Sequence, residues 1–238
     1  MRHLEFEVHG VNEFHFEPGQ FIHVIERYSD KEVARAYSIA SPPGGNRFDL
    51  CLNRAPEGFV SAWLFRLKPG DEVDMVEPDG HFTLRQPNGR AIFISTGTGV
   101  APFRSMLLDH LPRTQPNITL LFGARRESDV LYRDEFERLS QGYRNFRFLP
   151  TLSSPGPNWN GRTGRVQAHL DEVLAGYRPE HLSDLNVYIC GVKEMVDDIR
   201  GKLKDRALRD EQIIYEKYEG PDQAITDSEQ LPEGVAKD

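Results

Sequence analysis

The chain has no long apolar segment. No run approaches the ~20 consecutive apolar residues that a membrane-spanning helix requires. The opening residues Met1–Glu5 are also too polar for the apolar part of a secretion signal. We therefore expect a cytoplasmic protein that does not cross a membrane.

Cysteine is scarce as well. Cys51 and Cys190 are the two cysteines of the chain, too few for a disulfide framework, a four-cysteine zinc site or a four-thiolate iron-sulfur cluster. The histidines, among them His81, His110 and His169, show no metal-ligand spacing. We predict no metal, so an iron-sulfur partner would have to be a separate chain.

Basic residues are in the minority. The formal net charge is -8, which argues against a nucleic-acid-binding surface, because such surfaces concentrate basic residues. Residues 219–238 contain six acidic residues against Lys237, together with Pro221 and Pro232 and little apolar content. This segment is predicted to be an acidic C-terminal extension that is disordered or loosely packed.

The first part of the chain is rich in short segments that alternate between apolar and polar residues. Turn-forming prolines and glycines separate these segments, a pattern typical of an antiparallel barrel or sandwich. Val60–Leu67 instead has its apolar residues at helical spacing. The expected strands are Phe21–Ile25, Ala36–Ile39, Arg47–Leu52 and Glu72–Val76.

The pattern changes after Gln86–Arg90. Continuous apolar strands now alternate with helix-like stretches, which indicates a parallel sheet covered on both faces. The expected strands are Ala91–Ile94, Ile118–Phe122 and Asn186–Cys190, and the expected helices are Pro102–Leu111, Tyr132–Leu139 and Lys193–Leu208. The 238 residues are therefore predicted to form a β domain over residues 1–88 and an α/β domain over residues 89–218.

A glycine-rich turn, Thr96–Pro102, lies between an apolar strand and a helix. Glycines there let backbone N–H groups approach a pyrophosphate, and Pro102 suits a first helical turn. The G-x-G-x-x-G register is absent, so a plain tight turn stays open beside the nucleotide-binding interpretation.

The segment Arg35–Ser41 combines an arginine, a tyrosine and two serines. Arg35 suits a phosphate and Tyr37 suits a planar cofactor, although a tyrosine in a strand also serves as core packing. Ser61 opens the helix of the β domain, where it either caps the helix or binds a phosphate.

Together these segments resemble the ferredoxin-NADP reductase family, particularly its plant-type members. The similarity covers residues 15 to 218 and follows the family order. The matching elements are Arg35–Ser38, Gly58–Ser61, Pro78–Phe82, Thr96–Ser105, Leu131–Phe136 and Tyr188–Met195.

This resemblance implies a two-domain protein, with FAD in a six-stranded antiparallel β-barrel and a nicotinamide dinucleotide on a parallel-sheet domain. By it, Arg35 holds FAD phosphate, Tyr37 stacks on the flavin and Ser38 lies near flavin N5. It assigns cofactor binding to Arg35, Ala36, Tyr37, Ser38, Leu52, Asn53, Gly58, Phe59, Val60, Ser61, Thr96, Gly97, Thr98, Gly99, Pro102, Arg125, Ser153, Gly191 and Met195.

The resemblance also implies catalytic roles for Ser38, Cys190, Glu216 and Tyr218. Cys190 would align the nicotinamide, Tyr218 would be a displaceable lid over the flavin, and Glu216 would connect Ser38 to solvent as a proton relay. Plant-type members finish at that aromatic residue, whereas this chain continues for twenty residues after Tyr218.

The choice between NADH and NADPH stays open. In NADPH-specific relatives an arginine, a lysine and a tyrosine hold the 2′-phosphate, where this chain has Ser154, Thr163 and Arg165. The loss of the bidentate arginine favours NADH or dual use, unless Arg125, Arg126, Arg162 or Arg165 replaces it.

The leading functional hypothesis is a monomeric FAD-dependent oxidoreductase that takes hydride from NADH or NADPH and passes single electrons to a separate ferredoxin-like or oxygenase partner. A basic patch of Arg35, Arg54, Arg66, Lys68 and Arg85 would receive an acidic partner. The alternatives are a reductase of free flavin or small oxidants, and a non-catalytic flavin- or nucleotide-binding electron-transfer subunit.

Overall fold

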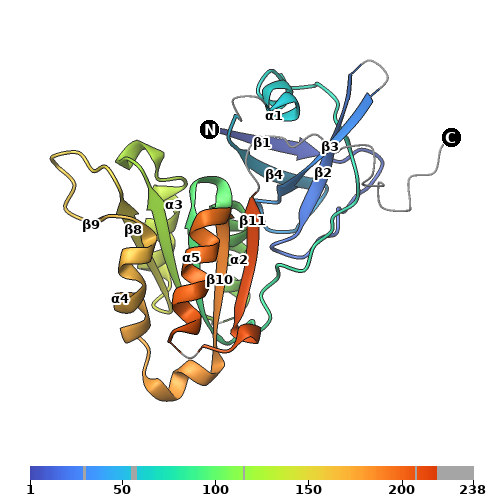
Figure 1. The fold of residues 1–238 in the computed structure, drawn as a ribbon. Coiled ribbons are helices and arrows are strands. Elements are labelled where there is room, and N and C mark those ends of the chain that lie inside the picture. The colour runs from blue at the N-terminus through green and yellow to red at the C-terminus, as the bar shows by residue number, and fades with distance from the viewer. Residues whose placement is uncertain (29–30, 55–57, 115, 207, 219–238) are drawn as a thin grey trace.

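The computed structural model describes residues 1–28, 31–54, 58–114, 116–206 and 208–218, so the predicted acidic extension at 219–238 lies outside the described residues. The chain folds into two lobes, an all-β lobe at the N-terminus and a larger α/β lobe, which lie side by side (Figure 1). The predicted fold class, antiparallel sheets followed by a parallel-sheet domain, is confirmed.

The N-terminal lobe is built from two small antiparallel sheets. β1 pairs with β4, and β2 lies between β3 and β5. In β1, partly buried and exposed residues alternate, as expected when one face of a strand covers a core. The elements are β1 (Arg2–Glu7), β2 (Phe21–Tyr28), β3 (Lys31–Ser38), β4 (Arg47–Leu52), the helix α1 (Phe59–Leu64) and β5 (Asp74–Met75).

This lobe has five strands among the described residues, not the six that the resemblance implies. Where a sixth strand would close the barrel, the chain meets β2 only through the isolated bridge between Phe21 and Asp79. Pro78 has no N–H to donate, and Gly80 has a positive φ of 105°, so a regular ladder does not continue there. A second bridge, between Ile39 and Leu50, joins the two sheets.

The C-terminal lobe is a six-stranded parallel sheet in the order β11-β10-β6-β7-β8-β9. Leu185 to Gly191 of β10 are buried without interruption, which explains why all of them except Asn186 are non-polar or aromatic. The strands are β6 (Arg90–Thr96), β7 (Asn117–Ala124), β8 (Phe146–Leu152), β9 (Arg162–Thr163), β10 (Leu185–Val192) and β11 (Ile213–Tyr218).

Helices cover both faces of this sheet. On one face Phe103, Met106 and Phe136 pack against Phe93 and Tyr188, and on the other face the apolar sides of two further helices pack in a second cluster. The helices are α2 (Ala101–Arg113) and α3 (Arg133–Gly142) on the first face, and α4 (Leu170–Ala175) and α5 (Lys193–Lys204) on the second.

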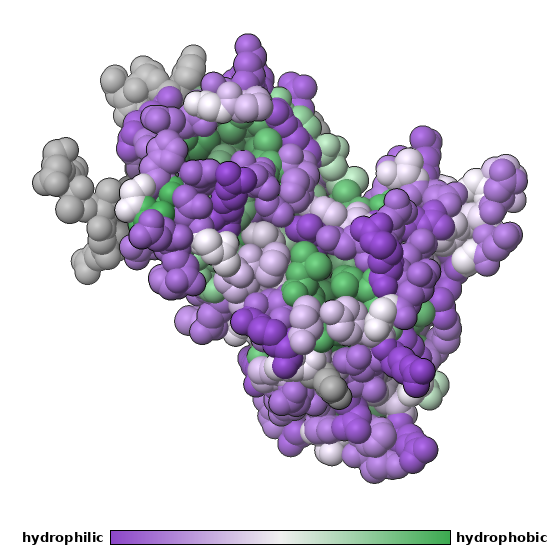
Figure 2. All heavy atoms as spheres, turned by 180° about the vertical axis from the view of Figure 1, so that it is seen from behind, coloured by the Kyte–Doolittle hydropathy of each residue, from purple (hydrophilic) through white to green (hydrophobic). Residues whose placement is uncertain are grey.

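The segment between the lobes is held against the sheet. The Phe82 ring lies 5.6 Å from the Phe103 ring and 5.8 Å from the Tyr188 ring, and the backbone N–H of Arg85 donates to the Tyr188 hydroxyl at 2.9 Å. Seen from behind, apolar atoms gather in the hollow where the two lobes meet (Figure 2). The lobes therefore share packed contacts.

Candidate functional site

The strand order reverses direction next to β6. From β6 the chain continues outward through β7, β8 and β9, and then returns to place β10 on the other side of β6. At such a switch point the loops after two neighbouring strands separate, which leaves a crevice at the carboxyl ends of the strands where α/β proteins bind ligands. At this point the Thr96–Val100 turn lies against the Cys190–Gly191 segment of β10.

Backbone contact across the switch point requires glycine. A Cβ atom added to Gly99 would lie 2.3 Å from the Cys190 carbonyl oxygen and 3.1 Å from the Gly191 Cα. Gly97 has a φ of 55°, a conformation that glycine adopts without steric cost. The turn therefore lies directly against β10, and α2 begins right after it at Ala101 with Pro102 in its first turn.

Four predicted catalytic residues meet beside this turn. The Ser38 hydroxyl donates to Glu216 Oε2 at 3.3 Å and lies 3.2 Å from the Tyr218 hydroxyl. The Cys190 thiol lies 3.8 Å from the same Glu216 oxygen. The Tyr218 hydroxyl also lies 3.5 Å from the Thr98 carbonyl oxygen. Ser38 comes from the N-terminal lobe and the others from the C-terminal lobe, so the cluster bridges the two.

Sheet register explains how the C-terminal lobe presents these side chains. Cys190 of β10 pairs with Glu216 of the parallel edge strand β11, and paired residues of neighbouring strands point to the same face. Tyr218 follows Glu216 by two residues and therefore points to that face too. Ser38 ends β3 and is buried.

Burial governs the protonation of this cluster. Burial raises the pKa of Glu216, although hydrogen bonds from Ser38 and Cys190 oppose the shift. Burial, reinforced by the nearby Glu216 carboxylate, raises the pKa of Cys190 well above its ordinary value. Burial also raises the pKa of Tyr218. The raised pKa favours the protonated thiol over the nucleophilic thiolate, while Glu216 is a carboxyl group suited to holding a proton.

The raised pKa of Glu216 predicts a pH-dependent loss of stability. The folded state holds this proton more tightly than the unfolded chain, so stability falls as the pH rises from the ordinary pKa of 4.5 through the folded pKa. Glu216→Gln removes the titration and is expected to raise the melting temperature more at mildly alkaline pH than at pH 4.5. Thermal unfolding at several pH values measures this, with the exposed Glu77→Gln as control. An equal shift at every pH would contradict the assignment.

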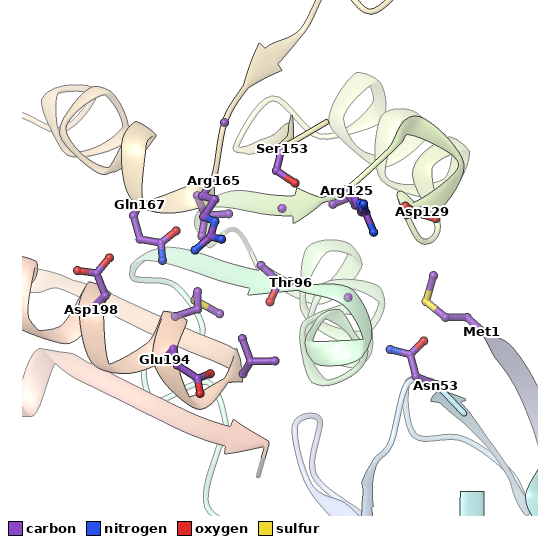
Figure 3. A pocket seen from close by; sticks show the side chains of 17 residues that line it. Met1, Asn53, Thr96, Arg125, Asp129, Ser153, Arg165, Gln167, Glu194 and Asp198 are labelled. Atoms are coloured by element: carbon purple, nitrogen blue, oxygen red, sulfur yellow. The ribbon is translucent and has the colours of Figure 1, made fainter. Parts of the chain in front are cut away.

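A cavity of about 870 Å³ lies at the carboxyl ends of the parallel strands (Figure 3), within the size range of small-molecule sites. Arg125 follows β7 and Ser153 follows β8, whereas Asn53 reaches the cavity from the N-terminal lobe. Six of the predicted residues line it: Asn53, Thr96, Gly97, Arg125, Ser153 and Met195.

Sequence reasoning missed part of the cavity wall. Gln167, Glu194 and Asp198 line it but were not predicted. Their signal was positional, since Gln167 follows the strand β9 and the other two lie on α5, directly after β10. Segments that follow the strands of a parallel sheet meet at its ligand-binding edge.

The structure separates the four arginines considered as phosphate partners. Arg125 and Arg165 line the cavity, and Figure 3 shows them reaching it from different segments. The Arg162 guanidinium is instead paired with Glu172. Arg126 is exposed next to Arg125.

The predicted FAD residues of the N-terminal lobe lie on β3, at the end of β4 and at the start of α1. Arg35, Ala36 and Tyr37 belong to β3, and the Arg35 guanidinium donates to the Ala34 carbonyl oxygen at 2.8 Å. Leu52 ends β4. Gly58, Phe59, Val60 and Ser61 form the beginning of α1.

The interpretation of Ser61 as a helix cap is wrong. Gly58 occupies the N-cap position, and the Ser61 hydroxyl, one turn further on, donates to the Gly58 carbonyl oxygen at 3.2 Å. Cys51 is buried, as expected of a core residue.

Membrane spans and metal clusters are both absent from the described residues. No helix in this part of the chain is both long and apolar enough to span a membrane. Nor does any group of three or more histidine, cysteine, aspartate or glutamate residues within the described ranges have the arrangement of a metal site.

Two family models match the chain, each over one lobe. The oxidoreductase FAD-binding domain matches residues 1–84, and the oxidoreductase NAD-binding domain matches residues 93–201. The first match covers β1 to β5, and the second covers the parallel sheet from within β6 to within α5.

Curated relatives show the same likeness. Ferredoxin--NADP reductase B of Sorangium cellulosum is 44% identical over 207 residues, which covers 84% of each chain. The F component of the Na(+)-translocating NADH-quinone reductase of Idiomarina loihiensis is 34% identical over 218 residues, which covers 82% of this chain. The chain spans about half of that component, 51% of its length.

Solved structures share the fold. The Amycolatopsis cytochrome P450 reductase GcoB has a TM-score of 0.79 at 26% identity, over 90% of this chain and 64% of that one. A ferredoxin NADP+ reductase from Neisseria gonorrhoeae with bound FAD and NADP has a TM-score of 0.75 at 23% identity, over 90% and 92% of the two chains.

Proposed function

The chain belongs to the ferredoxin-NADP reductase family of FAD- and NAD-binding oxidoreductases, and from that premise we propose that it oxidises a nicotinamide dinucleotide and reduces a separate one-electron acceptor protein. One observation carries the proposal. Ser38 of the FAD-binding lobe lies within hydrogen-bond distance of Glu216 of the dinucleotide-binding lobe, so the two lobes form one site.

The residues at the switch point suit a dinucleotide. Gly97 leaves open space, since the nearest atom to a Cβ placed there is Asn53 Nδ2 at 3.8 Å, whereas Gly99 lets the turn pack against the backbone of Cys190. Glycine turns of this kind let backbone N–H groups approach a pyrophosphate at a helix N-terminus. We propose that Thr96, Gly97, Thr98, Gly99 and Pro102 hold the dinucleotide, with Arg125, Ser153, Gly191 and Met195 around it.

On the N-terminal lobe we propose that β3 and the start of α1 hold FAD. Arg35 would bind its phosphate, Tyr37 would stack on its ring system, and Gly58–Ser61 would bind the pyrophosphate. Ala36, Leu52 and Asn53 would complete the site. FAD, when bound, supplies the redox chemistry, because it takes up a hydride and releases the electrons one at a time.

The Ser38, Glu216, Cys190 and Tyr218 side chains would assist by holding protons and orienting the nicotinamide. With FAD bound, Ser38 would turn its one hydroxyl hydrogen from Glu216 to the cofactor. Ser38 would then accept a hydrogen bond from protonated Glu216, which would exchange protons with solvent. Cys190 would pack against the nicotinamide. Tyr218 would cover the site and move aside when the nucleotide enters.

The same arrangement supports a proposal for the domain division and the oligomeric state. We propose the boundary at residue 88, between the last antiparallel strand, β5, and the first parallel strand, β6. Residues 1–88 would then bind FAD and residues 89–218 the dinucleotide. Because Ser38, Cys190 and Glu216 come together within one chain, the enzyme would work as a monomer.

The proposed acceptor is a separate ferredoxin-like or oxygenase protein. Arg54, Arg66 and Lys68 are exposed on the N-terminal lobe and would attract an acidic partner, although the chain carries a net charge of -8. The likeness to a component of a NADH-quinone reductase makes a quinone the second candidate for the acceptor.

The test compares acceptors. The purified protein, given FAD and either nucleotide, is expected to reduce a plant-type ferredoxin, and increasing salt should slow this reduction because charges guide the encounter. Free FMN and a soluble quinone are the comparison acceptors. Faster reduction of free FMN than of any protein acceptor would favour a free-flavin reductase. Failure to oxidise either nucleotide with every acceptor would favour a non-catalytic binding role.

Arg165 is expected to bind the 2′-phosphate that distinguishes NADPH from NADH. We expect both nucleotides to be used and Arg165→Ala to raise KM for NADPH roughly ten- to hundredfold, since hydrogen bonds between charged groups contribute about 1.5–3 kcal/mol. KM for NADH should change little. Steady-state kinetics measure both constants, and Arg126→Ala, at an exposed position, is the matched control. Equal effects on both nucleotides would exclude this role.

A further inference from the structure

Arg104 is a charged side chain enclosed where the lobes meet. It lies on α2, and its side chain is only 13% exposed. Its guanidinium donates to both carboxylate oxygens of Glu135, at 2.6 and 3.1 Å. Its Nη1 donates to the Ala40 carbonyl oxygen at 2.9 Å and to Asp49 Oδ2 at 3.1 Å. Three of its nitrogen atoms are thus bound at once.

These partners belong to different lobes. Ala40 lies just after β3, and Asp49 lies on β4, both in the N-terminal lobe. Glu135 lies on α3 of the C-terminal lobe, and the guanidinium carbon lies 4.5 Å from the centre of the Tyr132 ring. A planar, forked cation suits this geometry, whereas lysine would supply a single point of charge.

Further contacts surround Arg104 at the same junction. The Ser105 hydroxyl donates to the Ser41 carbonyl oxygen at 2.5 Å. His3 lies 3.4 Å from the Asp49 carboxylate and 2.8 Å from the Tyr132 hydroxyl. A small apolar cluster of Ala40, Cys51 and Ala101 lies beside them. The ion pairs are therefore part of a packed interface.

The charged groups around Arg104 stabilise one another. Burial raises the pKa of the Asp49 carboxyl, but the hydrogen bonds and charges of His3 and Arg104 outweigh it, and the net pKa is lowered. A buried cation that loses one partner is costly, because the remaining charge has neither water nor a counter-ion. Substitution of Arg104 or Asp49 should therefore affect stability more than substitution of a residue in a surface ion pair.

The junction is coupled to the candidate site through short, rigid connections. Ala40, which Arg104 holds, lies two residues after Ser38. Arg104 itself lies on the first turn of α2, directly after the Gly97–Val100 turn. A shift at the guanidinium would move Ser38 relative to Thr98 and Cys190.

We propose that Arg104, together with Asp49 and Glu135, is an interlobe latch that fixes the distance between Ser38 and the nicotinamide-binding turn. Arg104 is a positioning residue, since it acts through Ala40 and α2 without touching the reacting groups. The inference rests on the proposed function for its kinetic consequence. The structural part of the proposal, that Arg104 joins the two lobes, does not depend on the proposed reaction.

The test uses the FAD-loaded protein and three substitutions. Arg104→Lys removes the forked guanidinium. Asp49→Asn weakens the contact of Arg104 with the N-terminal lobe, and Glu135→Gln weakens its contact within the C-terminal lobe. Arg113→Lys is the matched control, since Arg113 lies on the same helix with a 63% exposed side chain. The readouts are the rate of flavin reduction at saturating nucleotide, the nucleotide Kd, and hydrogen exchange at the Ala40 amide, which donates to the Asp49 carbonyl oxygen at 2.8 Å.

We expect Arg104→Lys and Asp49→Asn to slow flavin reduction roughly 10- to 100-fold, because misplacement by about 1 Å has effects of this size. Both should speed exchange at Ala40 and leave the nucleotide Kd nearly unchanged. Glu135→Gln should have a smaller effect, and Arg113→Lys none.

An unchanged rate of flavin reduction and unchanged exchange at Ala40 in Arg104→Lys would overturn the latch. A lowered melting temperature without a change in the rate of flavin reduction would also overturn it, because that result indicates a purely structural role. If nucleotides fail to reduce the wild-type flavin, the proposed function fails, and exchange at Ala40 still decides whether the latch exists.

Discussion

Ser38→Ala is expected to slow flavin reduction by roughly 10²- to 10³-fold, the range that one hydrogen-bond donor aimed at developing negative charge contributes. Ser38 is buried and is the N-terminal lobe's member of the cluster with Glu216, Cys190 and Tyr218. Without its hydroxyl, the hydrogen-bonded link from Glu216 to the cofactor is broken. Because Ser38 would not contact the adenosine end of the nucleotide, KM should change much less than kcat.

Anaerobic stopped-flow measurement of flavin bleaching checks this result. Ser140→Ala is the control, since Ser140 lies on α3 and its hydroxyl donates to the carbonyl oxygen of Phe146 at the start of β8. FAD content measured by absorbance separates lost chemistry from lost cofactor. A rate in Ser38→Ala within a factor of about two of wild type would show that the Ser38 hydroxyl does not stabilise the flavin during hydride transfer, since a single aimed donor contributes far more.

Gly99→Ala is expected to have the second-largest effect. The new Cβ would lie 2.3 Å from the Cys190 carbonyl oxygen and 2.8 Å from its carbonyl carbon. Both neighbours are backbone atoms of a buried strand, so they cannot rotate away as a side chain would. The turn must withdraw from β10, at a cost of about 1–3 kcal/mol, typical of an overpacked site, and the crevice at the switch point changes shape.

Chemical denaturation and nucleotide titration measure the two consequences. We expect a lower free energy of unfolding and a raised Kd for both nucleotides. Gly142→Ala is the matched control, because no atom lies within 4 Å of a Cβ placed there and alanine favours the helical conformation of α3. Wild-type stability and nucleotide affinity in Gly99→Ala would show that the turn tolerates a side chain.

The apolar runs predicted the core of the parallel sheet well. Ala91–Ile94, Ile118–Phe122 and Asn186–Cys190 all lie within β6, β7 and β10, because strands buried on both faces leave a continuous signal. β8 was missed, since Arg147 interrupts its run and only part of the strand is buried. The short helix α4 was missed too, as six residues carry too little periodicity.

Helix ends were less predictable than helix positions. Tyr132 was expected to begin α3 but precedes it, in the left-handed conformation with φ 53°. α5 ends at Lys204 rather than at Leu208. Terminal residues are decided by local turns and tertiary contacts, which leave little trace in apolar spacing.

The candidate site could be predicted only from the family resemblance, because no periodicity places Ser38 next to Glu216, 178 positions away in the chain. The contacts of Arg104 had no sequence signal either. Its partners Ala40, Asp49 and Glu135 belong to three segments, and only the docking of the two lobes brings them together. Pairings of this kind depend on tertiary structure rather than on local pattern.

We propose that a hydride passes from the nucleotide to FAD where the two lobes meet. Anaerobic stopped-flow reduction of the FAD-loaded protein tests this at saturating NADH and NADPH, each carrying either hydrogen or deuterium at nicotinamide C4. The flavin absorbance should bleach, and deuterium on one face of C4 should slow the bleaching. A flavin that neither nucleotide bleaches, or bleaching that is equally fast with deuterium on either face, would contradict it.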